Sequence, residues 1–349
     1  MAEERSKSNE LAEIGEFGLI KRITARATIK NESTLKGVGD DCAVLSYPGK
    51  KVVVTTDLLT EGVHFNLIYV PLKHLGYKAV SVNISDICAM NALPRQITVS
   101  IALSSKFTVD AIDDLYAGIH LACEHYGVDL IGGDTTSSLT GLTISVTAIG
   151  EADASELVYR SGAKPTDLLC VTGDLGGAYL GLQLLERENE LFRLNPTVQP
   201  QLTGYDYILA RQLKPEARVD MRDIFSTLDL KPTSMIDISD GLSSEILHLC
   251  EDSGVGCRLY EERLIFDPQV KKMAEEIHIN PLVAALNGGE DYELLFTIPI
   301  TEHEKVRNHP DITVIGHMTR KEEGSMLVTS GGLQEIPLTA QGWNPLKGN

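Results

Sequence analysis

The chain has 349 residues, a length that predicts about two domains and a large hydrophobic core. Hydrophobic residues make up 43% of the sequence and charged residues 23%, which is typical of a globular protein. The net charge of −18 and the isoelectric point near 4.9 argue against nucleic acids and anionic membranes as partners, and any phosphate would have to bind together with cations.

Helices and strands alternate along the first half of the chain. The expected elements are a helix at 13–29, a loop leading into a strand at 37–47, a strand at 51–59, a helix at 72–90, a strand at 96–103, a helix at 108–126, and strands at 129–133 and 142–151. The β-branched stretch 51–59 predicts a buried strand that ends at Asp57. Apolar residues at the helical period place Asp86 inside or just past the helix at 72–90.

A polar, turn-rich segment at 158–167 predicts a domain boundary near 150–165. The elements expected after it are a strand, a Gly-rich turn and a helix over 168–185, a helix at 204–213, a strand at 234–238, a helix at 241–253, a strand–helix pair at 264–279, and strands at 290–298 and 312–318. This interleaving predicts a mixed α/β (α+β) enzyme with domains at 1–152 and 153–349.

Six scattered cysteines without a C-x-x-C pair argue against a zinc site or a disulfide framework. The charged N-terminal stretch lacks the apolar segment of a signal peptide. No apolar run approaches the roughly 20 residues that a membrane span needs. We therefore expect a cytoplasmic protein.

Aspartates recur where an apolar segment meets a turn rich in Gly, Ser or Thr. They are Asp40, Asp41, Asp57, Asp86, Asp134, Asp237 and Asp240. One such residue alone is usually a helix cap or a turn residue. The repeated choice of Asp favours hard oxygen ligands for Mg²⁺ together with substrate phosphates. Two of these residues end the similar stretches NISD (83–86) and DISD (237–240), for which chance and internal duplication both remain open.

Rival motifs are incomplete. An EF-hand loop starting at Asp237 would need Gly where Leu242 stands, and GVGDDC has Cys42 in place of the third Gly of a dinucleotide-binding motif. The sequence contains no P-loop, H-E-x-x-H or G-x-S-x-G motif. Gly-rich turns at 132–138, 173–178 and 287–293 could present backbone N–H groups to phosphates, although a tight turn explains each one singly.

Taken together, the motifs resemble the thiamine-monophosphate kinase family, of the aminoimidazole-ribonucleotide-synthetase-like superfamily. They are GEFGLIKRI (15–23), GVGDDCAVL (37–45), TTDLLTEGVHF (55–65), YKAVSVNISDICAM (77–90), LIGGDTT (130–136), RSGAKP (160–165), VTGDLGGA (171–178), DISDGL (237–242) and GGEDYELLFTI (288–298). The resemblance implies that ATP and several Mg²⁺ ions convert thiamine monophosphate to thiamine diphosphate. It also implies a homodimer formed through the sheet of the first domain, with the second domain completing the active site.

The resemblance assigns roles by position. Mg²⁺ ligands would be Asp41, Thr55, Thr56, Asp57, Asp86, Asp134, Asp237 and Asp240. ATP would contact Gly133, Asp134, Arg160, Ser239 and Tyr116. Thiamine monophosphate would contact His64, Glu290 and Trp343. The sequence departs from the family at Asn91 and Thr166, where Gly is usual, and the segment 186–230 matches it poorly.

The residue types agree with direct in-line phosphoryl transfer. The attacking oxygen belongs to a phosphate that is already anionic, so no general base is expected. Unit charges about 4 Å apart repel by about 4 kcal/mol at an effective dielectric near 20, so phosphates and aspartates could assemble only around several divalent cations. Two alternatives remain: the same site with another phosphate acceptor, and a non-catalytic protein that binds nucleotide or divalent cations.

Overall fold

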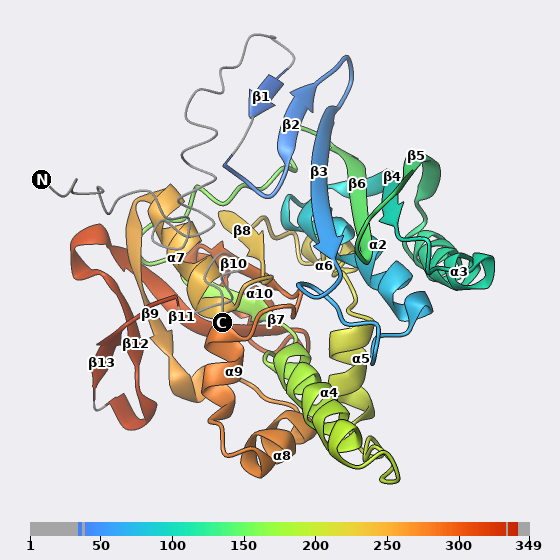
Figure 1. Cartoon of the computed structure of the whole chain (residues 1–349). Helices are drawn as coiled ribbons and strands as arrows, with labels where there is room; N and C mark the ends of the chain where they lie inside the picture. The colour runs from blue at the N-terminus through green and yellow to red at the C-terminus, as the bar shows by residue number, and fades with distance from the viewer. Residues whose placement is uncertain (1–33, 37–38, 333, 341–349) are drawn as a thin grey trace, which may run out of the picture.

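The first of two β-sheets fills the N-terminal half of the chain (Figure 1). The computed structural model describes residues 34–36, 39–332 and 334–340. The strand order is β1-β2-β3-β6-β4-β5, with β4 and β5 parallel and the other neighbours antiparallel. The strands are β1 (Thr34–Lys36), β2 (Ala43–Ser46), β3 (Lys51–Thr60), β4 (Leu93–Leu103), β5 (Asp129–Ser137) and β6 (Leu142–Ala152).

Helix α2 (Leu72–Ala89) packs against β3 and β6, and α3 (Val109–Tyr126) packs against α2. Strand β6 shows why one face of the sheet is covered, because its residues alternate between fully buried and partly exposed along its whole length. The helices approach closely, since a Cβ on Gly76 would lie 2.0 Å from the Leu115 carbonyl oxygen. From Leu75 to Ala89, every residue of α2 except Asp86 is buried.

The second sheet has the order β13-β12-β9-β11-β7-β10-β8, with only β9 and β12 parallel among its described strands. The strands are β7 (Leu168–Thr172), β8 (Ser234–Asp237), β9 (Val255–Tyr260), β10 (Leu294–Ile298), β11 (Ile312–Arg320), β12 (Ser325–Val328) and β13 (Glu335–Pro337). The helices are α4 (Gly177–Leu194), α5 (Asp206–Leu213), α6 (Met221–Thr227), α7 (Leu242–Ser253), α8 (Pro268–Glu276), α9 (Pro281–Asn287) and α10 (His303–Val306).

Helix α2 joins the two halves, because it contacts β8 and α5 as well as the first sheet. One continuous core therefore contains residues of both sheets, including Ile144 and Phe296. A second core lies between the second sheet and α7. The end of α2 thus meets the end of β8 in the interior, which brings Asp86 close to Asp237.

The mixed α/β fold is confirmed, and most expected elements are present within a few residues of their predicted bounds. The helix expected at 13–29 lies outside the described residues. Strand β3 continues past Asp57 to Thr60, and it is not buried throughout, because alternate residues such as Leu58 lie on the uncovered face of the sheet. The prediction of a strand starting at 264 is wrong. The strand of this region is β9, which starts directly after Gly254 ends α7 and is complete at Tyr260.

Two departures from the resembled family occupy unusual backbone conformations. Asn91 has φ of 54° and Thr166 has φ of 79°. Glycine adopts positive φ readily, Asn tolerates it, and a β-branched residue there is strained. The glycine that is usual at both positions therefore matches the backbone geometry of this chain. Within the described part of the chain, no helix is both long and apolar enough to span a membrane.

Candidate functional site

Three carboxylates meet where the two sheets adjoin. Asp41 precedes β2, Asp86 lies in the last turn of α2, and Asp237 ends β8. One carboxylate oxygen from each lies within 4.8 Å of the other two. Three segments far apart in the sequence thus supply one cluster, and we call these residues the aspartate cluster.

Neighbouring polar groups orient the aspartate cluster. Thr55 Oγ1 donates to Asp86 Oδ2 at 2.6 Å, and Ser85 Oγ donates to Asp237 Oδ2 at 2.6 Å. Thr55 and Asp57 point to the same face of β3 because residues two apart in a strand share a face. This alternation places Asp57 beside the cluster, where its charge adds to the electrostatic repulsion at Asp86.

Arg160 is paired with the cluster. Its Nη2 atom lies 2.6 Å from Asp41 Oδ1, and the Asp41 side chain is 1% exposed. Asp41 Oδ2 and Arg160 Nε are buried and have no hydrogen-bond partner among the described residues. A buried carboxylate oxygen without a partner is costly, so this side of the cluster is suited to a further cation.

Burial raises the pKa values of the carboxyl groups of Asp57, Asp86 and Asp237, and neighbouring negative charges add to the rise at Asp86 and Asp237. Burial is the largest cause at each position, and it raises the pKa of Asp57 to about 6 and that of Asp237 to about 7. The pKa of Asp86 rises well above its usual value through burial and then through the charges of Asp57, Asp237 and Asp41. A divalent cation would remove this repulsion, and an all-oxygen donor set fits Mg²⁺.

A second polar group lies around Glu290, in the loop between α9 and β10. Glu290 Oε1 lies 2.7 Å from Lys78 Nζ, and its Oε2 accepts from Gln212 Nε2 at 2.9 Å. His64 Nδ1 accepts from the Thr60 backbone N–H at 3.0 Å. Burial lowers the pKa of His64, the charge of Lys78 lowers it further, and the charge of Glu290 partly opposes this fall.

Known proteins resemble this chain over nearly its whole length. A family model described as "AIR synthase related protein, N-terminal domain" matches residues 39–152. The thiamine-monophosphate kinase of Bacillus subtilis (strain 168) is 37% identical over 338 residues, which cover 95% of this chain and 99% of the relative. The enzyme of the same name from Escherichia coli (strain K12) is 33% identical and covers 91% and 94%. The chain belongs to the thiamine-monophosphate kinase family.

Solved structures of the family have the same fold. The structure described as "AaThiL complexed with AMPPCP and TMP" has a TM-score of 0.82 and 34% identity, and the match covers 97% of this chain and 99% of that one. Thiamine-monophosphate kinase from Stenotrophomonas maltophilia K279a has a TM-score of 0.70 and 30% identity, covering 90% and 96%. A hydrogenase maturation protein HypE in complex with ATP, 18% identical with a TM-score of 0.68, shares the fold.

Not every residue that the family resemblance singled out lies beside the aspartate cluster. The Thr56 hydroxyl donates to the Val146 carbonyl on the opposite face of β3. Asp134 lies on the edge strand β5 beside Ser100, and the register places it on that same opposite face. Three strand spacings, about 14 Å, separate β5 from β3. Tyr116 lies on α3, where its ring contacts His120.

The remaining predicted residues lie near the junction, on the edge strand β5 or outside the described part. Ser239 and Asp240 follow β8, where the Ser239 carbonyl accepts from the Glu290 N–H at 2.7 Å. Gly133 adjoins Asp134 on β5, and a Cβ there would lie 1.8 Å from the Val99 carbonyl oxygen. Trp343 lies outside the described residues.

Sequence reasoning missed several buried polar residues of this family member. Lys78 and Gln212 hold Glu290, and Glu245 of α7 accepts from the Asp240 N–H at 2.9 Å. Lys78 had a usable signal, because it interrupts the apolar face of a helix, whereas Gln212 had none. Asp291 also corrects the phosphate-binding interpretation of one Gly-rich turn: its carboxylate accepts from the Gly176 N–H at 2.8 Å, so the protein itself occupies that donor.

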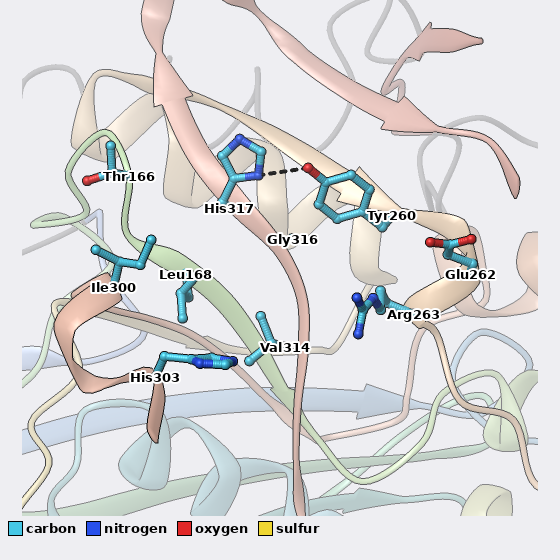
Figure 2. A pocket seen from close by; sticks show the side chains of 10 residues that line it. All are labelled: Thr166, Leu168, Tyr260, Glu262, Arg263, Ile300, His303, Val314, Gly316 and His317. Atoms are coloured by element: carbon cyan, nitrogen blue, oxygen red, sulfur yellow. Dashed lines mark hydrogen bonds between the residues drawn. The ribbon is translucent and has the colours of Figure 1, made fainter. Parts of the chain in front are cut away.

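Figure 2 shows a cavity of about 490 Å³ whose lining residues include none of the aspartate cluster. It lies over β7, β9 and β11, beside residues 300–303, and the Tyr260 hydroxyl lies 3.2 Å from His317 Nδ1 across its wall. Among the residues that the structure describes, none of the predicted metal, nucleotide or substrate residues lines it. Its lining residues are Thr166, Leu168, Tyr260, Glu262, Arg263, Ile300, His303, Val314, Gly316 and His317.

Proposed function

We propose that this chain transfers the γ-phosphoryl group of ATP to thiamine monophosphate, forming thiamine diphosphate and ADP. The observation that carries the proposal is the convergence of Asp41, Asp86 and Asp237 in a chain with 37% identity to a thiamine-monophosphate kinase. A relative's structure is described as complexed with AMPPCP and TMP, which supports the same pair of ligands here.

The chemistry follows from the charges of the site. A phosphate oxygen of thiamine monophosphate attacks the γ-phosphorus of ATP in line, while the bond to the β–γ bridging oxygen breaks and ADP leaves. The acceptor oxygen is already anionic, so the proposal assigns no general base. Asp41, Asp57, Asp86 and Asp237 would hold Mg²⁺, which when bound offsets the negative charge of the phosphates.

The other residues contribute by position. Arg160 would exchange its contact with Asp41 for the nucleotide, and Ser239 would lie beside it. His64 and Glu290 would face thiamine monophosphate, with Trp343 as a further contact. We keep the roles that the family pattern implies for the other residues, namely metal ligation by Thr56, Asp134 and Asp240 and nucleotide contact by Gly133 and Tyr116. Asp134 would have to reach these ligands from the edge strand β5.

We also propose two domains, 1–152 and 153–349, and a homodimer formed through the first sheet. The uncovered face of that sheet supports dimerisation, because Leu58 is 57% exposed on it and Ile131 on β5 is 58% exposed. Large apolar side chains exposed on the uncovered side of a sheet are a feature of surfaces that another chain covers. Light scattering at micromolar concentration should give twice the chain mass, and a monomer mass would reject the dimer.

The deciding experiment measures thiamine diphosphate formation from ATP, Mg²⁺ and thiamine monophosphate. Asp86→Asn should fold and lose nearly all activity, since it removes a charged ligand from the centre of the aspartate cluster. Near-normal turnover of Asp86→Asn at saturating Mg²⁺ would reject the metal role. A coupled assay of ADP release with other phosphate acceptors separates this proposal from a different acceptor, and ATP binding without any turnover would indicate a non-catalytic protein.

A further inference from the structure

Backbone conformation and backbone hydrogen bonds fix the position of Glu290 independently of its side-chain contacts. Its φ of 59° lies in the left-handed region, next to Gly289 with φ of 70°. The Glu290 N–H donates to the Ser239 carbonyl at 2.7 Å, and the Tyr292 N–H donates to the Ile238 carbonyl at 2.8 Å. A strained residue held by neighbouring hydrogen bonds is characteristic of functional positions. The loop therefore directs the Glu290 side chain away from β8 and toward α2 and α5.

Two buried side chains hold the two oxygens of this carboxylate separately. Lys78 of α2 is 3% exposed and lies 2.7 Å from Oε1, whereas Gln212 of α5 is 5% exposed and donates to Oε2 at 2.9 Å. Lys78 Nζ also donates to the Gln212 backbone carbonyl at 3.2 Å. Helices from both halves of the chain thus fix one carboxylate that is itself 29% exposed.

The hydrogen-bond inventory determines what Glu290 can offer a ligand. An ionised carboxylate only accepts, so the Gln212 amide must present its NH₂ group to Glu290. Each carboxylate oxygen has two acceptor sites, and the protein contacts above use one on each. Because Lys78 balances the charge, Glu290 presents a hydrogen-bond acceptor with little net charge. Such a group selects an N–H donor more than a cation.

We propose that Lys78 and Gln212 are positioning residues, which hold Glu290 as the acceptor for the amino group on the pyrimidine ring of thiamine monophosphate. This inference rests on the proposed function and adds the basis of substrate selection. Of the three parts of the substrate, the phosphate is an anion and the thiazolium is a cation without an N–H group. The aminopyrimidine is the part that supplies an N–H donor, so it matches an acceptor whose charge is already balanced.

The test compares thiamine monophosphate with the analogue whose pyrimidine amino group is replaced by an oxo group. A site built to accept from an amino group rejects an analogue lacking that donor strongly, so the wild type should prefer the amino substrate by more than about 100-fold in kcat/KM. Gln212→Met keeps the chain length and removes the donor to Glu290. We expect its KM for thiamine monophosphate to rise about tenfold, kcat to stay within about twofold, and the preference to fall about tenfold.

Two further variants complete the experiment. Gln199→Met is the matched control, because Gln199 is exposed in the same half of the chain, and it should leave both constants unchanged. Glu290→Gln introduces an amide that can donate, so it should lose most of the preference for the amino substrate. Unchanged KM and preference in Gln212→Met, or a fall confined to kcat, would overturn the inference while leaving the kinase proposal intact. A wild type that forms no thiamine diphosphate would overturn both.

Discussion

Replacing Asp237 with Asn should stabilise the metal-free protein. Asp237 is 3% exposed, and its pKa is raised from 3.8 to about 7 by burial and then by the charge of Asp41. A raised carboxyl pKa means that the folded state binds the proton more tightly than the unfolded state. Its contribution to stability is therefore present at low pH and is lost as the pH rises from about 4 to about 7.

The magnitude follows from this rise in pKa. Each pKa unit corresponds to about 1.4 kcal/mol, so the raised pKa of Asp237 lowers the unfolding free energy, relative to its value at low pH, by about 4 kcal/mol at pH 8 and by about 1.5 kcal/mol at pH 5. Asn keeps an oxygen that accepts from Ser85 Oγ, which preserves the 2.6 Å contact. We expect Asp237→Asn without metal to exceed the wild type in unfolding free energy by about 2–4 kcal/mol at pH 8.

Urea unfolding with a chelator present measures this difference at pH 8 and pH 5. Asp229→Asn is the matched control, because it makes the same change at a fully exposed carboxylate that is paired with Lys305. With Mg²⁺ added, the wild type should gain stability and Asp237→Asn should gain less. A variant less stable than the wild type at pH 8, or a difference that does not shrink toward pH 5, would refute the electrostatic reasoning.

Three other changes have definite expected outcomes. Thr166→Gly should raise the unfolding free energy by about 1 kcal/mol in chemical denaturation, because it relieves a β-branched residue at φ of 79°, and Thr166→Ala, which keeps a Cβ, should gain less. Lys78→Met should lower the melting temperature, since it leaves the partly buried Glu290 carboxylate without its ion-pair partner and the Gln212 carbonyl without a donor, at a cost of about 1–3 kcal/mol, whereas Lys50→Met at a surface pair should cost less than about 1 kcal/mol. Chelation of Mg²⁺ should lower the melting temperature of the wild type more at pH 8 than at pH 6, and equal losses would contradict metal binding by ionised aspartates.

Much of the fold was predictable because the apolar periodicity of this chain is strong. The helix at 72–90 and the strand at 142–151 were placed within two residues of α2 and β6. Strand β9 was missed because VGCRLY is short and contains both Gly and Arg, so its pattern is weak. What the pattern could not give was the strand order, since neighbouring strands in the first sheet are often distant in sequence.

That order explains which site residues could be grouped in advance. Asp41, Asp86 and Asp237 were all selected from the sequence, and they meet. Asp134 was selected on equal grounds, yet β6 and β4 separate its strand from β3. Sequence supplies the residue type at each position, whereas the distance between two carboxylates depends on pairing between strands. Gln212 shows the same limit, because an isolated glutamine becomes informative only beside Glu290.

The two similar stretches NISD and DISD are not equivalent in the structure. In the first, Ser85 and Asp86 belong to a helix, and Asp86 joins the aspartate cluster. In the second, Asp237 joins the cluster from the end of a strand, while Asp240, the counterpart by sequence, lies in the following turn and is held by Glu245. Ser85 donates across to Asp237, so the serine of one stretch supports the carboxylate of the other. The two stretches therefore occupy different local structures, and each of them supplies one carboxylate to the aspartate cluster.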